Sequence, residues 1–506
     1  MTKFRAFTAF LPFRKDLVVG FLVLLLAGTF AAWHVSDWPV KLRYPGEQDF
    51  AEGVPLAEMV HLRQGVPIYA PPSPERFDAA IYGPLYFLLG SRLVNPDEPA
   101  YLPLRVLSLL GTVGCAAGSG LLAFWLTRSY FAAGLAPLIF LSYGFVNSHG
   151  LSARPSLVAL FLFFSGFLIA YRFKGSRALL AAVPLMILGA YYKQQFVAGP
   201  LGVFLFLLLE KRYRLAAEFA GLMALGGLGL LAVFQWLVFP GQTFFRHFVI
   251  YNMLPFSRFW LSLGALYFAL TFLVPLLLGL EFLRVQRDKL LGCYLGCALV
   301  VGVGTTARPG SDSNYFLELA LVLRVLVASL MARNLSGPLG VSEMLVLLGV
   351  AFFFGQWFTP AAPRAEDFTR DRAVQEFLRS NFSHHAWALA PFPGDFLRAG
   401  LETPVTDPFQ YSQLVLHGRL PDRDMLVPLR GRRFAVIVTH FDLRDEGIAR
   451  HRTDPLPDSW REAILQEYHL VTTLEMPRPE KPTPEERFYI WVPRPCAQGS
   501  GVGSTP

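Results

Sequence analysis

The sequence predicts an all-α polytopic membrane domain of about eleven transmembrane helices, followed by a soluble α/β domain. Of the 506 residues, 53% are hydrophobic and only 16% are charged, whereas soluble domains carry about 25% charged residues. Long uncharged runs recur along the first 360 positions, and from Glu366 onward the composition is that of a soluble protein. We therefore expect a membrane domain over residues 1–360 and a soluble domain over residues 361–497.

The expected spans are apolar runs of roughly 20 residues, the length that crosses about 30 Å of hydrocarbon. They cover residues 17–33, 106–127, 129–148, 155–171, two short helices within 178–209, and then 219–239, 259–280, 290–307, 315–331 and 344–363. The two short helices meet near Lys193, where a re-entrant hairpin would give the same parity. No small-residue cleavage site follows the first run, which we therefore interpret as a retained signal anchor.

Basic residues predict how the spans are oriented. They gather in alternate connections, from Arg14 and Lys15 before the first span to Arg333 after the tenth. Cytoplasmic loops carry such an excess of Lys and Arg. We therefore expect a multi-pass protein of the inner or plasma membrane, with its N-terminus in the cytoplasm and the residues after 360 outside. These loops account for the net charge of +8, so nucleic-acid binding is not expected.

The first connection on the outer side, from about residue 36 to residue 102, is long. Two amphipathic stretches within it, at 50–64 and 84–94, are expected to lie as juxtamembrane helices in the plane of the interface. In the C-terminal region short apolar strands alternate with helices, which predicts a small α/β domain. Residues 498–506 are expected to form a disordered tail.

An acidic cluster stands just after the first span, where Glu47, Asp49 and Glu52 fall within ten residues. In an ordinary loop such carboxylates cap a helix or are solvated. Here the outer connections also carry polar and charged residues that topology does not explain, namely His149, Arg154, Lys193, Arg246, Arg258, Arg308, Asp312 and Asn314. Glu318 lies inside the tenth span, where a charge costs about 2.5–3.5 kcal/mol, so it needs a partner or a wet cavity.

Carboxylates and cations at one face of a bilayer suit the transfer of a sugar from a polyprenyl phosphate. The hydrocarbon tail of such a donor can pack against apolar helices, and its phosphate can accept hydrogen bonds from Arg or Lys. An acceptor hydroxyl needs a carboxylate base, and the departing phosphate needs fixed positive charge. We assign the base to Asp49 and the phosphate to Arg154, Lys193 and Arg308. Each cation taken alone is as well explained by snorkelling to the interface.

The chain resembles the GT-C superfamily of glycosyltransferases, in particular the bacterial relatives of protein O-mannosyltransferases and lipid A aminoarabinose transferases. Those enzymes carry an acidic motif in the first outer loop, and Glu47-Gln48-Asp49 is similar to its ExD form. Further similar motifs are Tyr82-Gly-Pro-Leu-Tyr86, Tyr192-Lys-Gln-Gln195, Tyr251-Asn252 and Asn314-Tyr-Phe-Leu-Glu318. Many relatives have Arg-x-Asp before the fourth span, where this chain has Arg154-Pro-Ser156.

The resemblance implies an integral-membrane hexosyl- or pentosyltransferase. It would move a sugar from a polyprenyl-phosphate donor to a hydroxyl of a lipid, glycan or protein acceptor outside the cytoplasm. Asp49 is then the expected general base and Glu47 an auxiliary catalytic acid. The expected substrate-binding residues are Glu52, Tyr82, His149, Arg154, Lys193, Gln194, Arg258, Arg308, Asn314 and Glu318.

Three alternatives stay open at this point. A divalent metal at Glu47 and Asp49 is one, although no His or third carboxylate stands at ligand spacing, and no other cofactor is expected. A lipid or sugar transporter or flippase is another, which would predict pseudo-symmetric halves with broken helices near mid-membrane. The third is a catalytically degenerate GT-C-like scaffold, and Ser156 is the residue that favours it.

Overall fold

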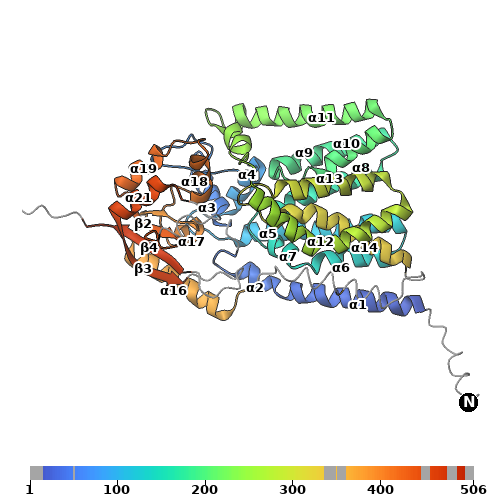
Figure 1. Ribbon diagram of the computed structural model, residues 1–506, viewed down its shortest axis with the longest axis horizontal. Helices are drawn as coiled ribbons and strands as arrows, with labels where there is room; N and C mark the ends of the chain where they lie inside the picture. The colour runs from blue at the N-terminus through green and yellow to red at the C-terminus, as the bar shows by residue number, and fades with distance from the viewer. Residues whose placement is uncertain are drawn as a thin grey trace, which may run out of the picture.

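The structure is a computed structural model that describes residues 15–48, 52–334, 349, 361–445, 456–475 and 487–495. Apolar helices lie side by side in a bundle, and a small domain with a mixed sheet covers one end of it (Figure 1). The first helix, α1 (Lys15–Ser36), begins at the end of the bundle far from this domain and ends next to it. The two ends of the bundle therefore differ, and only one of them meets the C-terminal domain.

Five helical segments among the described residues are long and apolar enough to cross a membrane, or six if one bent pair forms a single span. The five are α1 with α2 (Trp38–Arg43), α5 (Leu102–Thr127), α11 (Tyr213–Ala232) with η2 (Val233–Val238), α12 (Arg258–Gln286), and η4 (Ser313–Phe316) with α14 (Leu317–Asn334). The bent pair is α6 (Tyr130–Leu141) and α7 (Gly144–Gly150), which meet at 73°. The shorter apolar helices are α8 (Ser156–Arg172), η1 (Arg177–Ala182) with α9 (Val183–Tyr192), α10 (Ala198–Leu209) and α13 (Lys289–Thr305).

The expected apolar runs up to residue 331 coincide with these helices. The last expected run, 344–363, lies outside the described residues except for position 349 and positions 361–363. A helical membrane domain is therefore present as expected, and eleven crossings stay a prediction. The four shorter helices have 10–17 residues, less than the roughly 20 that an untilted span needs.

Helix α14 forms the centre of the bundle. In its most apolar window 89% of the residues are buried, whereas only 6% are buried in the corresponding window of α11 at the edge. Apolar side chains point in all directions from α14, as expected for a helix enclosed on every side. Close contacts between the other helices depend on small residues. A Cβ added at Gly111 of α5 would stand 2.6 Å from the backbone of Leu157 in α8.

The loop between α2 and α5, which is the predicted first outer loop, contains the helices α3 (Gly53–Arg63) and α4 (Pro84–Leu93). Their positions match the two predicted amphipathic stretches, but α3 does not lie in an interface with one face exposed. Its residues from Gly53 to His61 are all buried. It packs against α4 and against the C-terminal domain, which together enclose it.

The C-terminal domain is built on a four-stranded sheet in the order β1-β2-β4-β3. Strands β1 and β2 are parallel, and β4 is antiparallel to both β2 and β3. Ile437 of β2 packs on one face of the sheet, and its neighbours Val436 and Val438 pack on the other. The elements are α16 (Ala365–Asn381), β1 (Trp387–Leu389), α17 (Pro393–Arg398), α18 (Pro408–Leu416), α19 (Arg423–Arg430), β2 (Phe434–Thr439), α21 (Asp458–Glu467), β3 (Tyr468–Glu475) and β4 (Arg487–Pro493).

Backbone contacts join the C-terminal domain to the first outer loop. The amide of Phe77 donates to the carbonyl of Pro404 at 2.8 Å, and the amide of Thr406 donates to the carbonyl of Phe77 at 3.1 Å. The ring of Phe77 also stacks on Tyr411 of α18 at 4.4 Å between centroids. The loop and the domain thus form one continuous layer over this end of the bundle.

Candidate functional site

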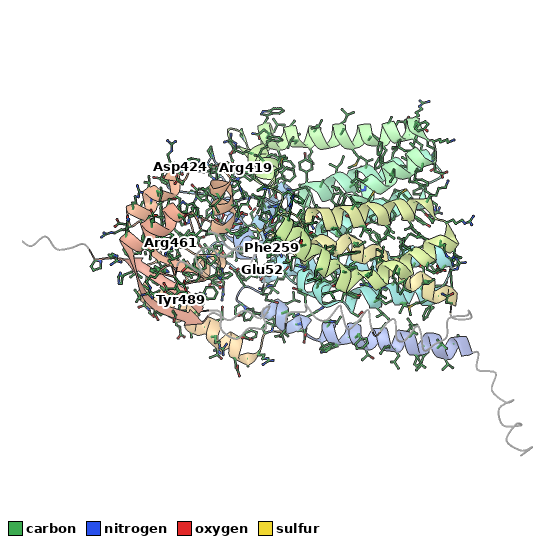
Figure 2. The ribbon with its side chains drawn as sticks, viewed as in Figure 1. Glu52, Phe259, Arg419, Asp424, Arg461 and Tyr489 are labelled. Atoms are coloured by element: carbon green, nitrogen blue, oxygen red, sulfur yellow. The ribbon has the colours of Figure 1, made fainter. Side chains whose placement is uncertain are left out.

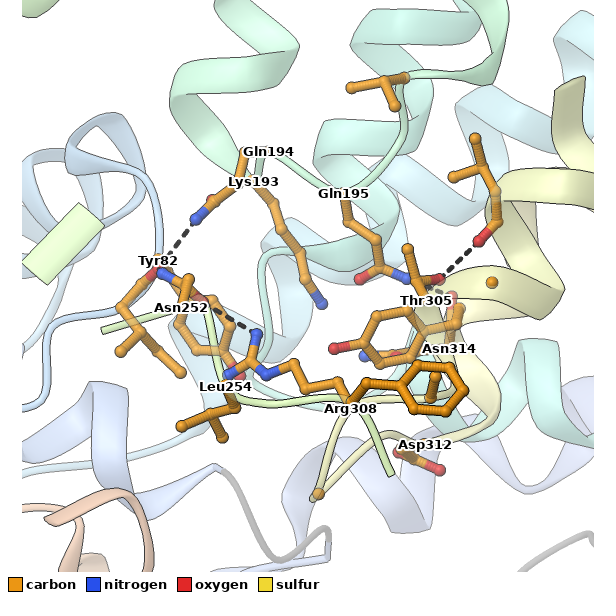
Figure 3. A pocket seen from close by; sticks show the side chains of 18 of the residues that line it. Tyr82, Lys193, Gln194, Gln195, Asn252, Leu254, Thr305, Arg308, Asp312 and Asn314 are labelled. Carbon is orange, nitrogen blue, oxygen red and sulfur yellow. Dashed lines mark hydrogen bonds between the residues drawn. The ribbon is translucent and has the colours of Figure 1, made fainter. Parts of the chain in front are cut away.

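A cavity of about 490 Å³ lies at the end of the bundle that faces the C-terminal domain (Figure 3). Its walls come from the connections before α4, between α7 and α8, between α9 and α10, before α12 and after α13. Six of the residues predicted to bind substrate line it, namely Tyr82, Arg154, Lys193, Gln194, Arg308 and Asn314. All three of the cations assigned to the phosphate are therefore brought together.

Arg154 stands beside a carboxylate. Its Nη1 lies 3.0 Å from Oδ2 of Asp312, and Nε2 of His149 lies 3.7 Å from the same oxygen. The His149 ring also bonds the hydroxyl of Ser313 at 2.8 Å. The Asp312 side chain is 43% exposed, and the neighbouring His149 and Arg154 side chains hold the pKa of its carboxyl below its ordinary value. The Asp312 carboxylate is therefore ionised and ties His149 to Arg154 at the rim of the cavity.

Lys193 is held by a hydroxyl and an aromatic ring. Its Nζ donates to Oγ of Ser156 at 2.8 Å and stands 5.4 Å from the ring centroid of Tyr82. Ser156 occupies the position at which many relatives have an acid. This is the departure from the Arg-x-Asp motif that the sequence shows. In the structure the neutral hydroxyl of Ser156 stands beside the ammonium group of Lys193.

Arg308 enters the cavity from the side opposite Lys193 (Figure 3). Its Nη1 donates to Oδ1 of Asn252 at 3.1 Å. The amide nitrogen of Asn252 donates in turn to the carbonyls of Ile81 and Phe248, at 2.7 and 3.0 Å. The side chain of Gln194 bonds the same two carbonyls. An amide network therefore fixes the guanidinium of Arg308 relative to the first outer loop.

Gln195, Asn252 and Asp312 also line the cavity, although they are not among the predicted substrate-binding residues. Gln195 donates from Nε2 to the carbonyl of Asn314 at 3.1 Å. Each of the three stands within six residues of a predicted cation in the sequence. For Gln195 and Asn252 a second signal was available, because they belong to the motifs Tyr192-Lys-Gln-Gln195 and Tyr251-Asn252 that resemble the GT-C superfamily.

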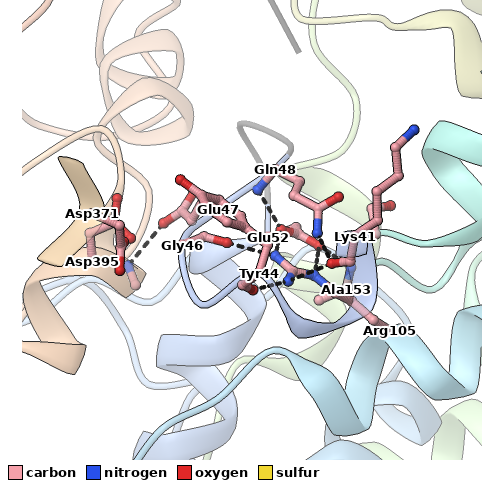
Figure 4. Close-up of polar contacts among 12 residues, drawn as sticks. Lys41, Tyr44, Gly46, Glu47, Gln48, Glu52, Arg105, Ala153, Asp371 and Asp395 are labelled. Carbon is pink, nitrogen blue, oxygen red and sulfur yellow. Dashed lines mark hydrogen bonds and ion pairs between the residues drawn. The ribbon is translucent and has the colours of Figure 1, made fainter. Parts of the chain in front are cut away.

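Glu52, by contrast, is not among the residues that line the cavity and lies where the bundle meets the domain (Figures 2 and 4). The side chains of Glu52 and Arg105 are both 0% exposed. Oε1 of Glu52 accepts from Nε of Arg105 at 2.9 Å and from the amide of Ala153 at 2.5 Å. Oε2 accepts from Nη2 of Arg105 at 2.6 Å and from the amide of Gln48 at 2.8 Å. This carboxylate is fully occupied by donors from the protein.

The same guanidinium organises the acidic loop. Arg105 donates to the carbonyls of Gly46 at 2.7 Å, of Lys41 at 3.3 Å and of Tyr44. We call Glu52, Arg105 and the loop groups that they bind the Glu52–Arg105 network. It joins the loop before α3, the start of α5 and the connection before α8, from which Arg154 enters the cavity.

Glu47 is buried and reaches the C-terminal domain. Its Oε1 accepts from the amide of Gly394, in the first turn of α17, at 3.2 Å (Figure 4). A Cβ at Gly53 would overlap this Oε1, and a Cβ at Gly394 would overlap the hydroxyl of Tyr101, so the close packing here favours glycine at both positions. Asp49, the predicted base, lies outside the described residues, and its assignment stays a prediction.

Two other predicted site residues are not among those that line the cavity. Glu318 accepts from the amides of Ala198 and Gly199, at 3.3 and 2.9 Å. The partner that this buried acid required is therefore the N-terminus of α10, where the helix dipole favours negative charge. Arg258 begins α12, and its side chain is exposed.

No protein-family model and no curated protein sequence matches the chain. Among solved structures it is similar to ArnT from Cupriavidus metallidurans in the apo state, with a TM-score of 0.52 and 13% identity. The similarity to ArnT bound to undecaprenyl phosphate has a TM-score of 0.51 and 12% identity. Both alignments cover 92% of this chain and 97% of ArnT. The expected resemblance is thereby confirmed at the level of structure: over nearly its whole length the chain has the fold of ArnT, a GT-C glycosyltransferase.

Proposed function

We propose that the protein is a membrane glycosyltransferase that moves a sugar from a polyprenyl-phosphate donor to an acceptor hydroxyl. The observation that carries the proposal is the convergence of Arg154, Lys193 and Arg308 on one cavity. They come from three separate connections at one end of the bundle. Snorkelling explains each cation alone, but it gives no reason for three of them to face a common space.

The chemistry of the cavity wall fits an anionic lipid headgroup. Asp312 is the one carboxylate among the described residues that line it, against three cations. Leu254, Pro255, Phe256 and Val301 give another part of the wall an apolar character. A phosphate can accept charge-assisted hydrogen bonds from Arg and Lys, while the first isoprene units contact the apolar part. ArnT, which has the same fold, was solved with undecaprenyl phosphate.

The proposed reaction needs only positioning, charge and one proton acceptor. The acceptor oxygen attacks the anomeric carbon of the sugar, and the bond from that carbon to the phosphate oxygen breaks. The leaving polyprenyl phosphate gains negative charge, which the three cations stabilise more strongly than they stabilise the donor. The proton of the hydroxyl passes to a carboxylate, for which we propose Asp49.

The two residues that precede Asp49 in the sequence are held by hydrogen bonds. Gln48, on one side, donates its amide to Glu52, and Glu52 itself is held by Arg105. Glu47 is held by Gly394. We propose that this loop presents Asp49 to the acceptor, with Glu47 auxiliary to it, and that the C-terminal domain lies outside the cytoplasm. A reporter fused after Arg372 that is active only in the cytoplasm would contradict this orientation.

The test is release of polyprenyl phosphate by purified protein from a panel of labelled polyprenyl-phosphate sugars. Asp49→Asn keeps the size of the side chain but removes its basicity, so turnover should fall by roughly two to four orders of magnitude. Glu47→Gln should cost less. If wild-type protein releases nothing from any donor while it remains folded, the proposal fails. If Asp49→Asn is active and Glu47→Gln is not, the two roles are exchanged.

A further inference from the structure

The first turn of α18 in the C-terminal domain touches two segments that build the cavity. One is the 250–252 segment, which carries Asn252. The other is the 308–312 loop, which carries Arg308 and Asp312. Phe409 and Gln410, the two residues that make these contacts, are adjacent in the sequence. Neither is among the residues that line the cavity.

Gln410 holds the first of these segments. The residue is 2% exposed, and its Nε2 donates to the carbonyl of Tyr251 at 2.6 Å. Arg419, after the same helix, donates to the carbonyl of Ile250 at 2.6 Å. The residue that follows Tyr251 is Asn252, whose side-chain oxygen accepts a hydrogen bond from the guanidinium of Arg308. A change at Gln410 is therefore transmitted through one residue of backbone to a partner of a cavity cation.

Phe409 holds the second segment. Gly310 has a φ of +73°, a conformation that favours glycine. A Cβ placed on Gly310 would stand 2.8 Å from Cε1 and 3.1 Å from Cζ of Phe409. The ring thus lies directly against the backbone of the loop that carries Arg308. The same helical turn limits the positions of both Asn252 and Arg308.

We propose that Gln410 and Phe409 are positioning residues for the cavity, so that docking of the C-terminal domain sets how tightly the donor phosphate is held. This inference rests on the proposed function, because it takes the ligand of Arg308 to be a polyprenyl phosphate. The coupling is reciprocal: a bound phosphate also stabilises the docked domain. The soluble domain is thereby part of the donor site, although it contributes no residue to its described wall.

The test compares the full-length variants Gln410→Leu and Gln413→Leu. Gln413 is buried on the same helix, and no hydrogen bond from it to the 250–252 segment occurs among the described residues, so it controls for loss of a buried amide. Binding of undecaprenyl phosphate in detergent should weaken about tenfold in Gln410→Leu, the effect of misplacing one charged hydrogen bond. Gln413→Leu should bind as the wild type does.

A second arm separates positioning from general destabilisation. In an Arg308→Ala background, Gln410→Leu should weaken binding no further, because the two changes remove the same interaction. Equal binding by Gln410→Leu and wild type, or an undiminished loss in the Arg308→Ala background, would overturn the inference.

Hydrogen exchange without ligand distinguishes failure of this inference from failure of the proposed function. Amides of the 250–252 segment and the 308–312 loop should exchange faster in Gln410→Leu than in Gln413→Leu. If wild-type protein does not bind the lipid, the proposed function fails, and unchanged exchange would then reject the positioning role as well. Faster exchange in these two segments would retain Gln410 as a positioning residue for a different ligand.

Discussion

The Glu52–Arg105 network and the cavity use similar residues in opposite ways. In the network both side chains are 0% exposed, and both carboxylate oxygens accept from the protein. In the cavity Lys193 and Arg308 face about 490 Å³ of space beside a hydroxyl and an amide. The difference teaches that the role of a charged residue in these loops depends on whether it faces an opposite charge of the protein or an open space. The network fixes the architecture, and the cavity has room for a ligand.

The largest effect is expected from breaking the Glu52–Arg105 pair. Removing one partner of a buried ion pair leaves an uncompensated charge and costs about 3–5 kcal/mol. Arg105→Ala and Glu52→Ala should therefore lower the free energy of unfolding by about that amount, measured by denaturant or thermal unfolding in detergent. Arg105→Lys should restore little, because an ammonium group cannot reproduce the bidentate contact. If Glu52→Ala unfolded like the wild type but lost donor binding, Glu52 would belong with the cavity residues.

An intermediate effect is expected at Ser156. A carboxylate at this position would pair with a cavity cation, as Glu52 pairs with Arg105 in the network. Ser156→Asp places a carboxylate next to Nζ of Lys193, which now contacts the Ser156 hydroxyl at 2.8 Å. The new ion pair should weaken donor binding about tenfold, because it neutralises one of the cations. Ser156→Asn keeps the size without the charge and serves as the control. Equal or tighter binding by Ser156→Asp would show that the acid found in many relatives also suits this cavity.

The smallest effect is expected at Glu58, a buried acid for which no ion pair occurs among the residues that the structure describes. Its Oε1 accepts from the amide of Ala80 at 2.6 Å and from Oγ1 of Thr406 at 3.2 Å. Burial, followed by the charges of Asp78 and Asp407, raises the pKa of Glu58 well above 4.5. The folded protein therefore holds this proton more tightly than the unfolded chain does. The contribution of Glu58 to stability is largest at low pH and falls as the pH rises through the raised pKa.

Glu58→Gln removes this ionisation while keeping the acceptor oxygen. The variant should unfold like the wild type near pH 4 and at higher temperature than the wild type near pH 8, as measured by thermal unfolding across pH. Glu75→Gln, at an exposed position of the same loop, should leave the profile unchanged. Parallel profiles for Glu58→Gln and wild type would mean that the pKa of Glu58 is the same in the folded protein as in the unfolded chain.

Much of the fold could be predicted from local patterns. Apolar runs predicted the helices up to residue 331, because a membrane span must satisfy its backbone and bury its side chains within a single segment. Short alternating strands predicted the sheet of the C-terminal domain. The three cavity cations could also be predicted, because Arg154, Lys193 and Arg308 stand in connections where the positive-inside rule gives no reason for them.

The roles of the acids could not be predicted in the same way. Glu52 and its partner Arg105 are 53 residues apart, and no periodicity connects them. Gln410 and Tyr251 are 159 residues apart and meet only through the docking of two domains. Glu318 finds its partner at the backbone of Ala198 and Gly199, which a sequence pattern does not reveal. Contacts of this kind depend on tertiary packing. A single sequence therefore shows that a charged residue is present but does not show which group it contacts.

The most direct test of the central claim is the affinity of the full-length protein for undecaprenyl phosphate when one cavity cation is removed. A charged hydrogen bond contributes roughly 1.5–3 kcal/mol, so Arg308→Ala should weaken binding by about one to two orders of magnitude with little change in thermal stability. Arg92→Ala, an exposed cation in the last turn of α4, is the control and should bind as the wild type does. Wild-type affinity in Arg308→Ala, Lys193→Ala and Arg154→Ala alike would contradict the claim that this cavity holds the donor phosphate.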